Sequence, residues 1–167
     1  KPAMSKNTFE FLQPRNWLPP KGYSNGVAAE GRQVFVAGQI GWSERAELVS
    51  DDFVAQVERA LANIVQVLAE AGGEPRHLTR LTWFVTDKSA YVARQKEIGE
   101  AYRRVIGRHF PAMSLIVVAG LLEPGAKGVA GSRLPSSGTA AHGSMRSSAN
   151  ASTTWAGGLV RLGEYER

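Results

Sequence analysis

Hydrophobic residues along this chain recur with a period of two in some segments and of three to four in others. Residues 26–29 and the apolar run 34–40, separated by a turn at 30–32, predict a β-hairpin. Gly38 interrupts the second run, which indicates that another part of the chain approaches closely there. Residues 81–85 and 114–119 are rich in β-branched and aromatic residues, so they predict two further strands.

Two segments have helical spacing. Apolar residues recur from Phe53 to Leu68, which predicts an amphipathic helix with Ser50 as its N-cap and an end at 72–73. A second helix is predicted after 86–89, with an apolar stripe from Tyr91 to Ile106 and an end at Gly107. The order β-β-α-β-α-β predicts an α+β fold with a mixed sheet and two helices on one face. The strands are apolar on both sides, so we expect self-association to bury the second face.

The ends of the chain differ from its middle. Residues 1–22 carry Pro14, Pro19 and Pro20 and few periodic apolar positions, which predicts an extended N-terminal arm. Residues 23–127 hold all the predicted elements and form one domain. Residues 128–167 are rich in Gly, Ser and Ala without periodicity, so we expect an atypical tail that is disordered or loosely packed through about residue 154.

Composition excludes several classes of site. The chain has no cysteine and only three scattered histidines, so we expect no disulfide, no thiolate nucleophile, no metal and no cofactor. It has no apolar run long enough for a membrane span and no signal pattern, so we expect a soluble cytoplasmic protein without a membrane partner. The net charge is +5, but basic and acidic residues alternate on the predicted helices, so nucleic acid is not an expected partner.

Several motifs occur together in one order. They are residues 22–25, 34–40, 60–64, 67–73, 83–87 and 109–114. In this order they resemble the RidA/YjgF family, formerly labelled endoribonuclease L-PSP, over roughly residues 20–127. The resemblance implies a chorismate-mutase-like fold and a homotrimer with small-molecule clefts between subunits. It also implies the hydrolysis of enamines and imines to keto acids, without a cofactor.

The residues that this chemistry requires are largely replaced. The family's carboxylate-binding arginine corresponds to Met113, its serine to Ala37, and its glutamate falls near Val129. A thioether cannot replace the bidentate hydrogen bonds of a guanidinium. We therefore predict no catalytic residue.

The positions that correspond to the family's cleft are expected to bind a ligand without catalysing its hydrolysis. The predicted ligand cleft is formed by Tyr23, Ala37, Gly38, Met113 and Ser114. His109 precedes the last motif, but the sequence shows no partner that would make it a general base.

Three functions remain open. The first is a homotrimer that binds small metabolites in its clefts with weak or no imine hydrolysis, the second is a non-catalytic regulatory module, and the third is RNA binding or cleavage.

The origin of the C-terminal tail, residues 128–167, also leaves two alternatives. Codons that encode 130–135 can read Arg-Ile-Glu-Ala-Thr in another frame, a sequence of the family type, so the tail is either natural or a frameshift product.

Overall fold

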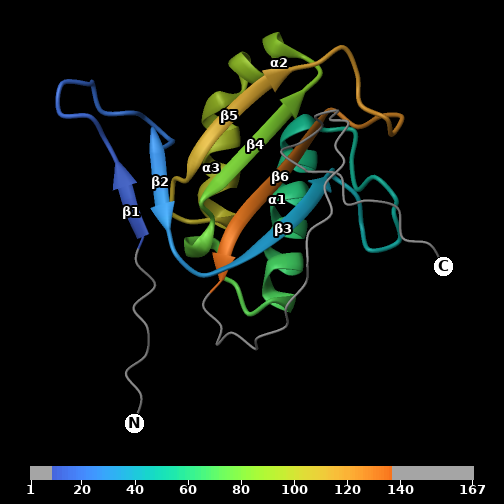
Figure 1. Ribbon diagram of the computed structural model, residues 1–167. Coiled ribbons are helices and arrows are strands. Elements are labelled where there is room, and N and C mark those ends of the chain that lie inside the picture. Colours follow the sequence, from blue (N-terminus) through green and yellow to red (C-terminus); the bar gives the residue numbers. More distant parts are fainter. Residues whose placement is uncertain (1–8, 137–167) are drawn as a thin grey trace, which may run out of the picture.

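The computed structural model describes residues 9–136, which form one sheet covered by helices and a small separate ribbon (Figure 1). The sheet has the strand order β3 (Arg32–Gln39), β6 (Gly128–Ser136), β4 (Arg80–Val85) and β5 (Ala112–Val117). Strands β4 and β5 are parallel and the other pairs are antiparallel, so the sheet is mixed. Helices α1 (Phe53–Glu70), α2 (Lys88–Ala93) and α3 (Gln95–Val105) cover one face. The predicted α+β class is confirmed.

The predicted hairpin between 26–29 and 34–40 is wrong in its pairing. Strand β2 (Gly26–Ala29) pairs with β1 (Phe9–Leu12), which lies in the predicted N-terminal arm, and β3 pairs with β6. Gly31 has a φ of 137°, which turns the chain away from β2 before β3 begins. Long-range partners for both strands therefore replace the local pairing that the turn suggested.

Helix α1 begins two residues later than the sequence predicts. The carboxylate of Asp52 accepts a hydrogen bond from the Ala55 N–H at 2.8 Å, so Asp52 is the N-cap. Ser50 instead accepts from the Asp52 N–H at 2.9 Å and shapes the entering turn. The end at Gly72 is confirmed by its φ of 72°, and the short 3-10 helix η1 (Pro75–His77) follows.

The single helix predicted after 86–89 is divided at Arg94. Asp87 caps α2 by accepting from the Ala90 N–H at 2.9 Å, and the chain bends before α3. The Arg94 side chain donates to Asp52 and to Glu97, so it joins the start of α1 to the junction of the two helices. The guanidinium of Arg94 is the main cause of the lowered pKa of Asp52.

Strand β6 contradicts the expectation that nothing regular follows Lys127. It pairs with β3 on one side and with β4 on the other, so it lies inside the sheet. A Cβ at Gly38 would stand 3.0 Å from Val129 Cγ2, so the atom that approaches this glycine belongs to a side chain of β6 and not to the backbone. The rest of the predicted tail, 137–167, lies outside the described residues, as do residues 1–8 of the predicted arm.

The hydrophobic core lies between the sheet and the helices. It includes Leu61, Ile64 and Leu68 of α1 together with Leu81 and Val85 of β4. The bidentate contact of Arg104 with Glu58, at 2.8 and 2.9 Å, joins α3 to α1 over this core. Within the described residues, no helix is long and apolar enough to cross a membrane.

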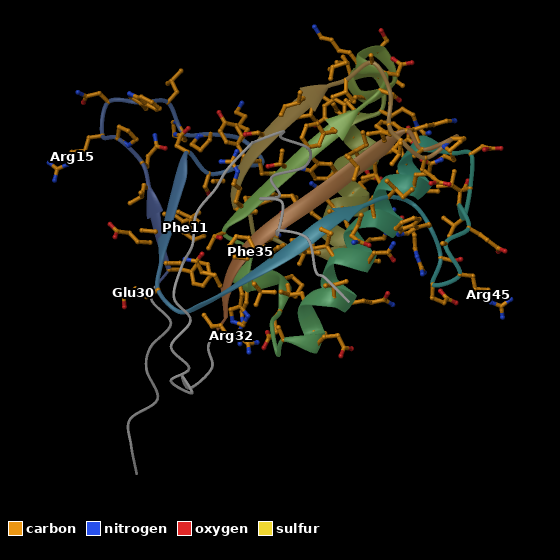
Figure 2. All side chains as sticks on the ribbon, turned by 45° about the vertical axis from the view of Figure 1, so that its right-hand side comes forward. Phe11, Arg15, Glu30, Arg32, Phe35 and Arg45 are labelled. Atoms are coloured by element: carbon orange, nitrogen blue, oxygen red, sulfur yellow. The ribbon has the colours of Figure 1, made fainter. Side chains whose placement is uncertain are left out.

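The other face of the sheet carries apolar side chains, and no helix of residues 9–136 covers it. Ile116, Phe84 and Val129 form a row across it, since Phe84 pairs with both of its neighbours. Phe35 lies on the same face, because its neighbour Val36 points into the core (Figure 2). Phe35 is 49% exposed and Ile116 is 43% exposed. An exposed apolar row of this kind typically marks an interaction surface.

Candidate functional site

The loop that carries Tyr23 is attached to the start of β5. The Ser24 N–H donates to the Pro111 carbonyl at 3.0 Å, and its hydroxyl donates to the Phe110 carbonyl at 2.5 Å. Gly22 precedes this anchor with a φ of 77°, which only glycine adopts without strain. These contacts place Tyr23 beside Met113, so the structure brings together two of the five residues predicted for the cleft.

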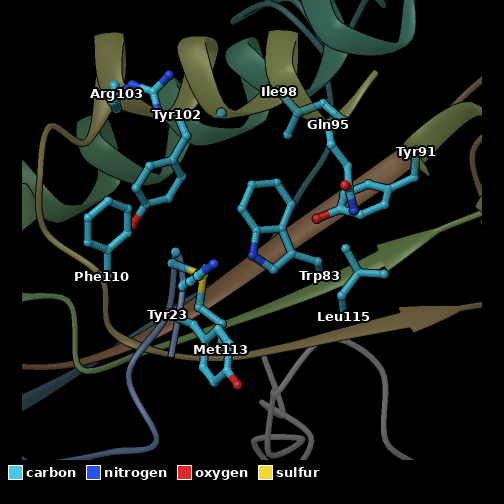
Figure 3. A pocket seen from close by; sticks show the side chains of 13 residues that line it. Tyr23, Trp83, Tyr91, Gln95, Ile98, Tyr102, Arg103, Phe110, Met113 and Leu115 are labelled. Atoms are coloured by element: carbon cyan, nitrogen blue, oxygen red, sulfur yellow. The ribbon is translucent and has the colours of Figure 1, made fainter. Parts of the chain in front are cut away.

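A pocket of about 610 Å³ opens at this place, between β4 and β5 on one side and α2 and α3 on the other (Figure 3). Aromatic rings supply much of its wall. The lining residues are Lys21, Gly22, Tyr23, Trp83, Tyr91, Gln95, Ile98, Gly99, Tyr102, Arg103, Phe110, Met113 and Leu115. Its size lies within the range of roughly 300–1,000 Å³ that is common for small-molecule sites.

The other three predicted cleft residues lie elsewhere in this chain. Ser114 pairs with Thr82 in register and points to the opposite face from Met113, where it accepts from Arg80 at 3.2 Å. Ala37 and Gly38 lie on β3, at the opposite edge of the sheet from β5. Within one chain the five residues therefore do not form a single site.

Most of the pocket wall was not identified as a site from the sequence. Tyr91, Ile98 and Tyr102 belong to the predicted helical stripe, which the pattern explains fully as core. Gln95 and Gly99 lie on the same side of α3 as Ile98 and Tyr102, and the glycine leaves space between that side and β5. A small residue within an otherwise large, aromatic stripe was the available signal.

Tyr91 and Tyr102, two tyrosines of the pocket wall, are held neutral by burial. Burial raises the pKa of Tyr102, and its hydroxyl donates to the His109 carbonyl at 2.6 Å. Burial also raises the pKa of Tyr91. Neither phenol is thereby prepared to act as a base near neutral pH.

The two described histidines lie outside the pocket wall, beneath strand β1. His109 Nε2 is 2.6 Å from the Leu78 carbonyl oxygen, and its ring contacts Phe9 and Phe11 with centroids 6.2 and 5.9 Å apart. His77 stacks on Phe9 at 6.3 Å. Both rings therefore support β1, and His109 has no contact that would make it a general base.

Protonation of His77 is expected to destabilise the fold. Its Nδ1 accepts from the Glu74 N–H at 2.9 Å, and burial, followed by the charge of Arg76, lowers its pKa below the usual 6.5. A lowered pKa in the folded state means that this contribution is complete above about pH 6.5 and is lost as the pH falls through the folded value. His77→Asn keeps an acceptor but does not titrate. We expect urea midpoints to fall less between pH 7 and pH 5 in this variant than in the wild type; equal falls would contradict the assignment.

Residues 9–136 contain no group of three or more His, Asp or Glu side chains placed to hold a metal ion. The polar groups that line the pocket are hydroxyls, an amide, an indole N–H and two cations. This set suits an organic ligand with acceptor atoms better than a cation.

The fold has a family counterpart. The family model described as Endoribonuclease L-PSP matches residues 15–127, so the chain belongs to this family, which is the RidA/YjgF family. The crystal structure of YyfB from Yersinia pestis, of the Rid protein family, superposes with a TM-score of 0.69 at 30% identity, covering 76% of this chain and 98% of that one. The chorismate-mutase-like fold implied by the sequence resemblance is thereby confirmed.

Curated relatives give the same family. Protein DfrA of Myxococcus xanthus is 34% identical over 101 residues, which cover 59% of this chain and 74% of that protein. The human 2-iminobutanoate/2-iminopropanoate deaminase is 27% identical over 100 residues, which cover 59% of this chain and 69% of that protein. The family match ends at residue 127, where the sequence pattern changes, although β6 continues the sheet.

Proposed function

We propose that this protein is a homotrimer that binds small metabolites in clefts between its subunits, and that imine or enamine hydrolysis is weak or absent. The observation that carries the proposal is the division of the predicted cleft. Tyr23 and Met113 lie at the β5 edge of the sheet, whereas Ala37 and Gly38 lie at the β3 edge. Residues at opposite edges can share one site when two copies meet edge to edge.

The apolar row on the helix-free face supports self-association. Ile116 is exposed and its neighbour Phe84 is half-buried, so a second and third copy would bury hydrophobic surface here. Burial of apolar surface contributes about 25 cal/mol per Å², which makes such a face a favourable contact. Three sheets facing a common axis would cover the row and bring neighbouring edges together.

The assignment of weak catalysis follows from the side chains at the pocket. Met113 offers no charge to a substrate carboxylate, and Ala37 offers no hydroxyl. Tyr91 and Tyr102 have pKa values raised by burial. The deaminase chemistry of the relatives needs an anchored carboxylate and a group that positions a proton, and the described pocket offers neither in the usual form.

Oligomeric state tests the proposal directly. Native mass spectrometry is expected to give three times the chain mass of 18.0 kDa. Ile116→Glu should dissociate the trimer because a charge would be buried in the contact. Val92→Glu, a matched change of an exposed valine on α2, should leave the mass unchanged. A wild-type monomer, or a trimer that Ile116→Glu leaves intact, would contradict the arrangement.

Catalysis is tested separately with an enamine generated from serine by a dehydratase. We expect the wild-type protein to release keto acid at a rate close to that of the uncatalysed reaction. Rapid hydrolysis would show that another group replaces the missing residues. A trimer without activity would support a role in ligand binding.

A further inference from the structure

The pocket between α3 and β5 contains more aromatic surface than a keto acid of three or four carbons could contact. Trp83 and Tyr102 approach with ring centroids 6.3 Å apart, and Tyr102 stacks on Phe110 at 5.7 Å with an interplanar angle of 11°. Figure 3 shows these rings along one wall, with Leu115 and Tyr91 completing the other end. Such walls favour a flat, apolar ligand through stacking and burial.

Trp83 also supplies a hydrogen-bond donor to the pocket. The residue is 8% exposed and lines the cavity, and its indole nitrogen is not one of the buried side-chain atoms that lack a partner among the described residues. In Figure 3 the indole lies at the centre of the pocket, with its nitrogen toward Met113. An indole N–H can only donate, so at this place it can donate to an acceptor atom of a ligand.

Arg103 supplies a positive charge at the edge of the same pocket. The neighbouring Arg104 is paired with Glu58 at 2.8 Å, whereas Arg103 has no acidic partner among residues 9–136. Its guanidinium lies over Gly99, with Nη1 3.6 Å from where a Cβ would be. A free guanidinium beside an apolar cavity favours a carboxylate and can bind it with two hydrogen bonds.

We propose that the pocket binds an aromatic 2-oxo acid, with the ring among Trp83, Tyr102 and Phe110 and the carboxylate at Arg103. The oxo group then accepts from the Trp83 N–H. The inference rests on the proposed function, because it takes this pocket as the binding part of the cleft and names its ligand class. It moves the acid-binding role from position 113 on β5 to position 103 on α3.

Calorimetric titration of the full chain with three matched probes tests the ligand class. Phenylpyruvate has both the ring and the acid, pyruvate lacks the ring, and methyl phenylpyruvate lacks the charge. We expect phenylpyruvate to bind at least tenfold more tightly than either of the others. Equal affinity for pyruvate and phenylpyruvate would overturn the inference and leave the proposed function standing.

Matched variants test the location. Arg103→Gln should weaken phenylpyruvate binding tenfold or more, whereas Arg104→Gln, one residue away and outside the pocket, should change it less than twofold. Gly99→Leu should block the pocket, and Gly99→Ala should not, since a Cβ there meets no atom closer than 3.6 Å. None of the three positions is among the buried residues of α3, so the fold should tolerate the changes.

The outcomes separate the two proposals. Tight phenylpyruvate binding that Arg103→Gln and Gly99→Leu abolish supports the inference, and it does so even for a monomer, in which case only the trimer fails. Binding that neither variant affects overturns the pocket assignment. A trimer that binds neither acid overturns both the ligand class and the metabolite-binding function.

Discussion

Replacing Gln56 with leucine is expected to lower the free energy of unfolding by about 3 kcal/mol. Gln56 lies on α1 with 0% exposure and fixes two loops through its amide. It donates to the carbonyls of Ser50 and Gly125 at 2.8 and 3.0 Å, and it accepts from the Lys127 N–H at 2.8 Å. Leucine would leave all three backbone groups without this partner, at about 1–3 kcal/mol for each that stays buried.

The loops that Gln56 holds have little room to move and form other hydrogen bonds after the substitution. A Cβ on Gly41 would stand 2.5 Å from Gln56 Cα, so the first loop already touches the helix backbone. Lys127 is the residue after which β6 begins, so the same amide fixes the entry into the central strand of the sheet. We therefore expect the loss of these hydrogen bonds to destabilise the sheet as well as the two loops.

Urea unfolding at a fixed protein concentration measures this effect, since association would shift the midpoint. Gln66→Leu is the matched control, because Gln66 is exposed on the same helix, and a change within about 0.5 kcal/mol is expected for it. If Gln56→Leu is as stable as Gln66→Leu, the two loops are held by other contacts.

Met113→Arg is expected to strengthen pyruvate binding tenfold to a hundredfold. Met113 is partly buried beside Tyr23 at the mouth of the pocket. An arginine there would offer a carboxylate charge-assisted hydrogen bonds, and a net gain of about 1.5–3 kcal/mol corresponds to roughly tenfold to a hundredfold, since about 1.4 kcal/mol is a factor of ten. Titration calorimetry of pyruvate with both proteins measures the gain.

Met113→Gln separates the effect of charge from that of polarity. It has nearly the same length as methionine and should change the pyruvate affinity less than threefold, because it offers only neutral hydrogen bonds. Equal gains for the two variants would contradict an electrostatic role for position 113. Hydrolysis is expected to remain slow in Met113→Arg, since Ala37 is unchanged and contributes no hydroxyl.

The sequence determined the elements whose signals are local. The spacing from Phe53 to Leu68 and the glycines at 72 and 73 were sufficient to place α1, because an amphipathic stripe and a positive φ are properties of adjacent residues. The motif around Met113, together with Tyr23, was sufficient to place the family and two residues of the pocket.

Only the tertiary structure decided the pairings and the pocket. The turn before β3 suggested a local hairpin, and residues 128–136 showed no periodicity. In the structure these residues form β6, which lies between β3 and β4. Hydrogen bonds to a neighbour on each side stabilise such a strand without any pattern in its own sequence. Arg103 carried no local signal of a site, and Gly99 offered only its small size within a stripe of large residues. Both become part of a site only when α3 packs over β5, since a cavity arises from the distance between elements and not from the pattern within either.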